Sequence, residues 1–251
     1  MSWVTKSSTE QYQAAPPPPE LTPRQKMDNW WHYHWLYVVA AIAGALIAGS
    51  IIKDTVFRPR PDYQVGVVSR YELPVDTANA LTEALTGFGE DLNGDGRVLV
   101  QLNQYTVDFH SEETNADAYS QMAGVTRLSA DLQSGGGTYV FLMEDPAGFE
   151  EQTGALQYLD GTVGDPDAPP TDWENMVYRW EDCPALTTLE LGEYQGQTLM
   201  DDSTGSSQEY LKQFYVGRRG VWDPKQAEKF AGCADFWNAL TAGAVPMEGQ
   251  P

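Results

Sequence analysis

The sequence is short of the residues on which most enzyme motifs depend. It has only three histidines and two cysteines among 251 residues. It contains no Walker loop, no dinucleotide-binding glycine loop, no zinc-ligand spacing and no nucleophile motif. Carboxylates are so numerous that no catalytic pair stands out among solvated ones. We therefore expect a protein without enzymatic activity and without a catalytic cofactor, and we keep an extracellular hydrolase as the enzymatic alternative.

Basic residues are also scarce. The chain has 36 acidic and 15 basic residues and a net charge of −21, and residues 63–251 alone hold 31 acidic and 9 basic residues, a net charge of −22. Phosphate groups of nucleic acids and anionic lipids repel such a surface. The composition therefore argues against nucleic acid as a partner, and it suits a domain that is exported from the cell.

Aliphatic side chains are nearly missing from the first 34 residues, which contain four consecutive prolines at Pro16 to Pro19. Such a segment cannot bury enough apolar surface to offset the loss of chain entropy. We expect residues 1–34 to be a disordered tail. Its last residues are amphipathic rings, which favour the boundary between membrane and water: Trp30, Trp31, His32, Tyr33 and His34.

Charged residues are missing from residues 35–52. As a helix this run would be ~27 Å long, which just spans a bilayer. We expect a transmembrane helix over 35–52, a linker over 53–62 and a cell-membrane location. Lysine and arginine are equally numerous on the two sides, so counting them does not predict the orientation. Because the acidic remainder suits an exported domain, we expect the N-terminus to be cytoplasmic and residues 63–251 to be extracellular. A cleaved signal peptide and an apolar core helix are the alternatives, and a proline-rich leader fits a signal peptide poorly.

Small residues recur every four positions in the apolar run, at Ala41, Ala45 and Gly49. This spacing lets two membrane helices approach closely, so it predicts a homodimer through this face. Alanine-rich composition alone also produces such spacing.

The exported part begins with alternating strand and helix patterns. Apolar runs at residues 63–69, 97–107 and 138–143 predict three strands, and helical spacing follows Pro74 and again Asn115. Strands that are apolar on both faces are typical of a parallel sheet covered by helices. We predict an α/β domain with a mainly parallel sheet and flanking helices, built from right-handed crossovers.

Later patterns are less regular. Residues 186–191 and 210–216 are strand candidates, and Pro224 opens a helix whose apolar stripe includes Phe230, Cys233 and Trp237. In the helix predicted after Asn115, the apolar residues Tyr119, Met122, Val125 and Leu132 fall on or near one face.

The two cysteines, Cys183 and Cys233, both lie in the exported part. An even count there predicts one disulfide, which would stabilise the domain by ~4 kcal/mol in the chain-entropy model. The alternative is two buried free thiols, because cysteine also behaves as a small hydrophobic residue.

The stretch DLNGDG, residues 91–96, resembles the first half of a calcium loop. Asp91, Asn93 and Asp95 would supply side-chain oxygens and Arg97 its carbonyl. Leu102 stands where a bidentate glutamate belongs. The alternatives are therefore a structural Ca²⁺ site and a tight turn in which glycine supplies positive φ and the carboxylates accept backbone hydrogen bonds.

The stretch TYVFLMEDPAGFEEQTGALQYLD, residues 138–160, resembles a segment of the extracellular solute-binding proteins of ABC importers. In those proteins an apolar strand is followed by polar residues, a helix with an inward phenylalanine, a Gly-Ala-Leu turn and a final Leu-Asp pair. The matching residues in this chain are Phe149, Gly154, Ala155, Leu156, Leu159 and Asp160. With KMDNWWHYHW and DLNGDGRVLVQLNQY, the chain also resembles uncharacterised membrane-anchored proteins of Gram-positive anaerobes. The resemblance covers roughly residues 20–160, and it implies one solute-binding lobe because residues 63–251 suffice for only one.

Ligands of open parallel sheets bind outside the carboxyl ends of the strands. The residues predicted there are Ser69, Arg70 and Tyr71, then Asn103, Gln104 and Tyr105, and finally Glu144 and Asp145. Ordinary loop polarity is the alternative explanation. Four tryptophans are further candidates for a carbohydrate or peptide surface: Trp173, Trp180, Trp222 and Trp237.

Two functional hypotheses follow. The first is a single-pass membrane protein whose extracellular domain binds or senses a small solute, a sugar or a peptide. The second is a structural or interaction protein of a membrane or envelope complex, with no small-molecule ligand.

Overall fold

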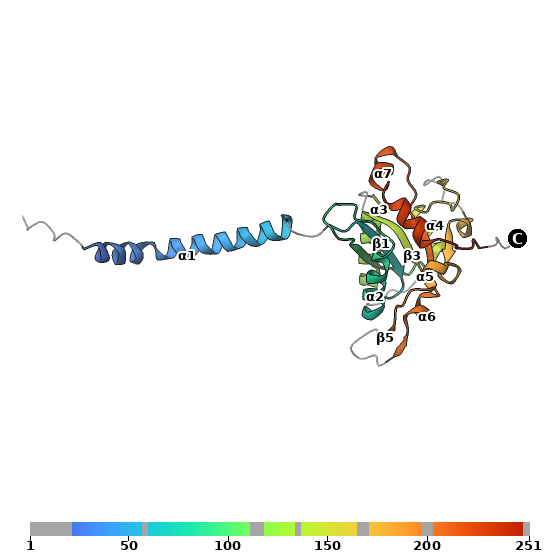
Figure 1. The fold of residues 1–251 in the computed structure, drawn as a ribbon, viewed down its shortest axis with the longest axis horizontal. Coiled ribbons are helices and arrows are strands. Elements are labelled where there is room, and N and C mark those ends of the chain that lie inside the picture. Colours follow the sequence, from blue (N-terminus) through green and yellow to red (C-terminus); the bar gives the residue numbers. More distant parts are fainter. Residues whose placement is uncertain are drawn as a thin grey trace, which may run out of the picture. The chain divides into compact units, whose positions relative to one another are not determined.

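A computed structural model describes residues 22–56, 60–110, 118–133, 137–164, 171–196 and 203–247 (Figure 1). The chain divides into two compact units, residues 1–59 and 60–251. Each unit is described by itself.

The first unit contains one helix, α1, over Pro23–Val56. Its start is a capping box, in which the Thr22 amide donates to Gln25 Oε1 at 3.0 Å and the Gln25 amide donates to Thr22 Oγ1 at 3.4 Å. Pro23 at the first helical position presets the helical φ. Residues 23–34, which the composition predicted to be disordered, are therefore helical. Residues 1–21 lie outside the described residues.

Helix α1 is long and apolar enough to cross a membrane. Its candidate span is Pro23–Ile51. The apolar window is not buried, unlike that of a core helix, but a signal sequence passes the same test, so a membrane anchor and a cleaved signal peptide both stay open. The Trp30 ring stacks on the His34 ring with centroids 5.1 Å apart, and His34 Nδ1 lies 2.9 Å from the Trp30 carbonyl oxygen.

The second unit is built on a five-stranded sheet of order β2-β1-β3-β7-β4. Strands β1 (Tyr63–Ser69), β2 (Val100–Thr106) and β3 (Thr138–Met143) are parallel. Strand β7 (Tyr215–Arg218) is antiparallel to β3, and β4 (Val177–Arg179) is antiparallel to β7. The predicted α/β class with a mainly parallel sheet is confirmed.

Helices cover both faces of this sheet (Figure 1). Helix α2 (Val75–Thr86) places Leu81 and Leu85 in one apolar cluster, and α3 (Ala118–Gln133) places Leu128 in the other. The chain runs from β1 outward to β2 and then back past β1 to β3. The order therefore reverses between β1 and β3, which makes the carboxyl ends of these two strands a topological switch point.

The remaining elements are short. Strands β5 and β6 form a separate two-stranded antiparallel sheet. The bounds are α4 Pro146–Thr153, η1 Trp173–Asn175, η2 Trp180–Asp182, α5 Pro184–Thr187, β5 Glu193–Gln195, β6 Thr204–Ser206, α6 Ser207–Leu211, α7 Pro224–Lys229 and α8 Cys233–Leu240.

Two predicted strands and one helix differ from the structure. Residues 186–191 form the end of α5 and a loop, where the Thr187 and Thr188 hydroxyls donate to the Pro184 carbonyl at 3.3 and 3.0 Å and so hold a helical turn. The strand predicted from residue 210 begins only at Tyr215, because α6 runs to Leu211. The final helix is divided into α7 and α8.

Helix α3 packs against the sheet through a glycine. A Cβ added at Gly124 would lie 2.1 Å from the Thr106 carbonyl oxygen, so only glycine permits this close approach. Of the four residues predicted near one face, Leu132 is half-buried against the apolar cluster around Leu128, and the other three are exposed: Tyr119 by 84%, Met122 by 70% and Val125 by 45%. Asn115, the expected cap, lies outside the described residues.

The predicted disulfide is absent: Cys183 and Cys233 are free thiols. Both are buried in the apolar cluster that includes Leu186 and Phe236. Burial raises the pKa of the Cys183 thiol to about 12 and that of the Cys233 thiol to about 11. The structure thus shows the alternative, two buried free thiols. Each side chain packs in the core as a small hydrophobic residue.

We expect neither thiol to react with a maleimide at pH 7.5 in the folded protein, because a buried thiol with a raised pKa supplies almost no accessible thiolate. Both thiols should react after unfolding in denaturant without reductant. Mass spectrometry of the labelled chain counts them. A chain that gains two labels only after reduction would show that the cysteines are bonded in solution.

Candidate functional site

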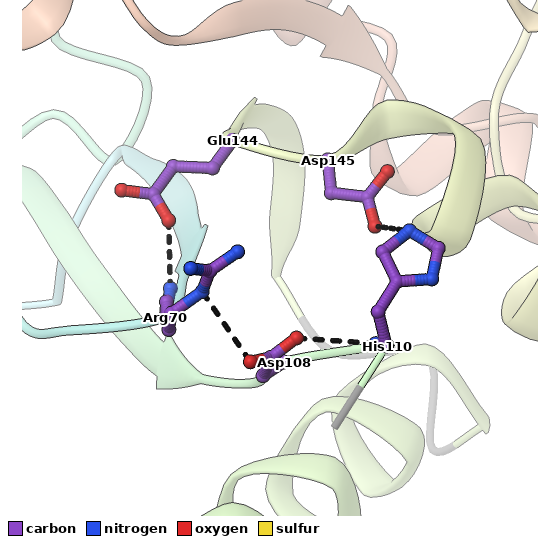
Figure 2. Close-up of polar contacts among 5 residues, drawn as sticks. All are labelled: Arg70, Asp108, His110, Glu144 and Asp145. Atoms are coloured by element: carbon purple, nitrogen blue, oxygen red, sulfur yellow. Dashed lines mark hydrogen bonds and ion pairs between the residues drawn. The ribbon is translucent and has the colours of Figure 1, made fainter. Parts of the chain in front are cut away.

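The carboxyl ends of β1 and β3 meet at the switch point. Val68 pairs with Met143 in the parallel register, so Arg70 and Glu144 follow from adjacent strand ends. The Arg70 amide donates to Glu144 Oε2 at 2.8 Å, which joins the two ends (Figure 2).

The loop after β2 reaches the same place. The Val107 amide donates to the Ser69 carbonyl at 2.9 Å and so continues the pairing with β1 by one step. This contact brings Asp108 beside Arg70, with 3.3 Å between Arg70 Nε and Asp108 Oδ2. Asp108 Oδ1 accepts a hydrogen bond from the His110 amide at 3.1 Å, which fixes the turn that carries the imidazole.

Asp145 links that imidazole to α4. Its Oδ1 accepts from the Gly148 amide at 3.0 Å, which caps α4 at its N-terminus, and Pro146 stands at the first helical position. Its Oδ2 lies 3.0 Å from His110 Nε2. This buried oxygen has no aligned hydrogen bond among the described residues, and its contact with His110 is an ion pair only when the imidazole is protonated. Figure 2 shows the five side chains converging from three strand ends.

Two cavities open at this cluster. The smaller has a volume of about 70 Å³ and lies among residues that include Asp108, His110 and Asp145. The larger has a volume of about 390 Å³, and its lining residues are Arg70, Tyr71, Glu144, Tyr210 and Gln213. Arg70 and Glu144 line both cavities. The larger volume falls within the range of small-molecule sites, which is about 300–1,000 Å³.

Five of the eight residues predicted from the strand ends come together here: Ser69, Arg70, Tyr71, Glu144 and Asp145 line one or both cavities. Ser69 contributes by holding the turn, since its hydroxyl donates to the Tyr71 carbonyl at 2.6 Å.

The other three predicted residues lie inside β2, which continues to Thr106. Gln104 Oε1 accepts from the Leu73 amide at 2.8 Å, and Asn103 Nδ2 donates to Thr138 Oγ1 at 3.0 Å. Burial raises the pKa of the Tyr105 hydroxyl to about 12. These side chains therefore hold the sheet and its neighbours together rather than line the cavities.

Asp108 and His110 were missed by sequence reasoning. The available signal was Val107, the last apolar residue of the second strand pattern, after which the polar positions follow directly. The predicted strand already ended at Val107, so choosing the residues that follow it, instead of residues 103–105 inside the strand, would have nominated both.

The DLNGDG loop lies elsewhere, at the amino end of β2. Asp91 Oδ1 accepts from the Gly94 amide and Oδ2 from the Gly96 amide, both at 2.7 Å, and these bonds lower the pKa of Asp91. Gly94 and Gly96 have φ of 76° and 84°, which favour glycine. Among the described residues no group of three His, Cys, Asp or Glu side chains is placed to hold a metal. Calcium binding by Asp91, Asn93, Asp95 and Arg97 stays a prediction.

The site combines one guanidinium, one imidazole and three carboxylates beside two tyrosine rings. Such a set can form charge-assisted hydrogen bonds with a polar solute and can stack a sugar or an aliphatic group on a ring. Comparison with protein-family models, curated proteins and solved structures finds no match, so the function has to be inferred from this geometry.

Proposed function

We propose that the protein is a single-pass membrane protein whose α/β domain, residues 60–251, lies outside the cell and binds a small polar solute without transforming it. The observation that carries the proposal is the convergence of Arg70, Asp108, His110, Glu144 and Asp145 at the switch point, beside a cavity of about 390 Å³. The resemblance of residues 138–160 to a solute-binding lobe supports the same conclusion.

The charges at the cavity favour solutes that carry both donors and acceptors. The Arg70 side chain is 59% exposed, so its guanidinium keeps donors for a ligand beyond the Nε contact with Asp108. Glu144 uses Oε2 for the Arg70 amide and presents a second carboxylate oxygen. Amino acids and sugars fit this combination of groups, because each offers acceptors to the guanidinium and donors to the carboxylate.

We expect the Arg70→Ala variant to bind its solute about tenfold or more weakly, because the guanidinium lines both cavities. The measurement is the melting temperature of the full chain in nanodiscs across a panel of sugars and amino acids. A solute at 100 times its Kd should add ~2.7 kcal/mol to the wild-type unfolding free energy.

The matched control is Arg127→Ala, which removes an exposed arginine from α3. It should bind like the wild type. A panel in which no solute raises the wild-type melting temperature, or one in which the Arg70 variant keeps the full shift, would refute solute binding at this cavity.

A second candidate is an interaction protein, and the exposed apolar face of α3 favours it. Tyr119, Met122 and Val125 are large side chains on one stretch of that helix, and such patches commonly mark contacts with other proteins. In the membrane helix, Ala41, Ala45 and Gly49 would support a homodimer. Recovery of the solubilised full chain as a bare monomer would count against this candidate.

A further inference from the structure

A larger cavity lies at the β4 end of the sheet. It has a volume of about 590 Å³ and shares no lining residue with the two cavities at Arg70. Its lining residues are Trp173, Glu174, Arg179, Asp182, Tyr215 and the C-terminal Val245, Pro246 and Met247. Tyr215 pairs with Met143, the last residue of β3, and with Arg179, so the cavity opens at the same end of the strands as the first site.

Two aromatic rings form a fixed wall of this cavity. The Trp173 and Tyr215 rings meet edge to face, with centroids 5.7 Å apart and an angle of 90°. Both rings are half-buried and pack on the apolar cluster that contains Phe149. The C-terminal segment adds apolar surface, and it is tied down by the Val245 amide, which donates to the Asp182 carbonyl at 3.1 Å.

The charge in this cavity is negative. Arg179 is the basic lining residue, and it is already paired, with 2.6 Å between its Nε and Asp182 Oδ2 and 3.4 Å between its Nη1 and Glu181 Oε1. Glu174, half-buried at the cavity wall, takes part in none of the ion pairs found among the described residues. Its carboxylate therefore remains available to a cation.

An adjoining cavity extends the acidic surface. It has a volume of about 410 Å³, and it shares Glu174 and Pro246 with the first and adds Asp160 and Asp172. The Tyr158 hydroxyl donates to Asp172 at 2.8 Å and lowers the pKa of that carboxyl, and bonds from Thr162 lower the pKa of Asp160. Both groups are therefore ionised at neutral pH.

The edge of the sheet supplies backbone groups beside the cavity. Among the residues that the structure describes, β4 pairs with β7 alone, and the Trp180 amide donates to the Phe214 carbonyl at 2.9 Å. Because hydrogen-bonding positions alternate along an antiparallel pair, the backbone N–H and C=O of Arg179 point away from β7 toward the open edge. An open edge of this kind can accept an extended peptide as an added strand.

We propose that these two adjoining cavities bind a short basic peptide segment. The aliphatic stem of a lysine or arginine would lie against Trp173 and Tyr215, and its cationic head would reach Glu174. The edge of β4 would hold the peptide backbone. Charge complementarity selects this occupant, because the lining carboxylates outnumber the single paired arginine.

Titration calorimetry of trilysine against the full chain, in nanodiscs of zwitterionic phosphatidylcholine, tests the proposal. We expect binding to the wild type and about fivefold weaker binding to Glu174→Gln, which removes one charge without removing the wall. Triglutamate and triglycine should not bind. Glu174 makes no hydrogen bond that holds the fold among those found in the described residues, so the melting temperature of this variant should match the wild type.

The control for attraction to the overall net charge of −21 is Glu83→Gln, an exposed position on α2. This variant should bind trilysine within about twofold of the wild type. Equal losses in the Glu174 and Glu83 variants would show non-specific attraction and overturn the proposal. It would also be overturned by absence of trilysine binding, or by a neutral trisaccharide that binds here while trilysine does not.

Discussion

Replacing Phe149 with alanine is expected to lower the free energy of unfolding by ~3–5 kcal/mol, the usual range for a large aromatic side chain removed from a core. Phe149 is fully buried on α4, and its ring centroid lies 5.1 Å from that of Phe141 in the central strand β3. It also meets the ring of Phe109, edge to face at 6.4 Å. Chemical denaturation of the full chain in detergent measures the loss.

Because Phe109 stands between Asp108 and His110, the same substitution should loosen the loop that carries these two residues of the candidate site. Phe149→Leu is the matched control, since it keeps most of the volume and should lose less than about 1.5 kcal/mol. A Phe149→Ala variant as stable as the Leu variant would mean that α4 does not pack on β3 as described.

The second large effect concerns a buried acid. The Glu150 side chain is 1% exposed, and burial raises the pKa of its carboxyl to about 6, although hydrogen bonds from the Leu156 and Ala155 amides oppose the shift. The folded state therefore holds this proton more tightly than the unfolded chain. Its contribution to stability is complete below about pH 4.5 and is lost as the pH rises through about 6, which amounts to ~2 kcal/mol.

Glu150→Gln should remove this dependence. The amide is neutral at every pH, and its oxygen can still accept from the Leu156 amide, so the variant should exceed the wild type by up to ~2 kcal/mol at pH 7.5 and approach it at pH 4. The measurement is the difference between the two unfolding free energies from pH 4 to pH 8, in which the titration of all other carboxylates cancels. Curves that run parallel across that range would show that Glu150 is ionised normally in the fold.

The parallel half of the sheet was predictable because its strands are buried on both faces and therefore appear in the sequence as runs of apolar residues. Strands β1 and β3 begin and end where the sequence placed them, at Tyr63–Ser69 and Thr138–Met143. The antiparallel part was predicted only at Tyr215 and Val216, within the strand candidate over 210–216, because β4 has only three residues and β7 only four. Such short strands are fixed by their neighbours rather than by their own pattern.

The errors share a physical origin in contacts between distant residues. The hydrophobic pattern of α3 grouped the half-buried Leu132 with three exposed residues, because the close approach of this helix to the sheet depends on the missing side chain of Gly124, which hydrophobicity does not record. The cysteine count predicted a bond, but a count carries no information on the distance between Cys183 and Cys233. Three of the five clustered residues, Arg70, Glu144 and Asp145, followed from topology alone. Asp108 and His110 were missed because residues inside the second strand were nominated instead of those after Val107.

The capped start of α1 would determine how far the helix reaches from a bilayer that it spans. With residues 35–52 in the hydrocarbon layer, the twelve residues from Pro23 would extend the rod by ~18 Å, at 1.5 Å for each residue. The headgroup layer on one side is only about 5–8 Å thick. The stacked rings of Trp30 and His34 would then cross that layer, while Thr22 and Gln25 close the helix in bulk water. The anchor would thus double as a rigid spacer, which holds whatever precedes Thr22 clear of the lipid surface.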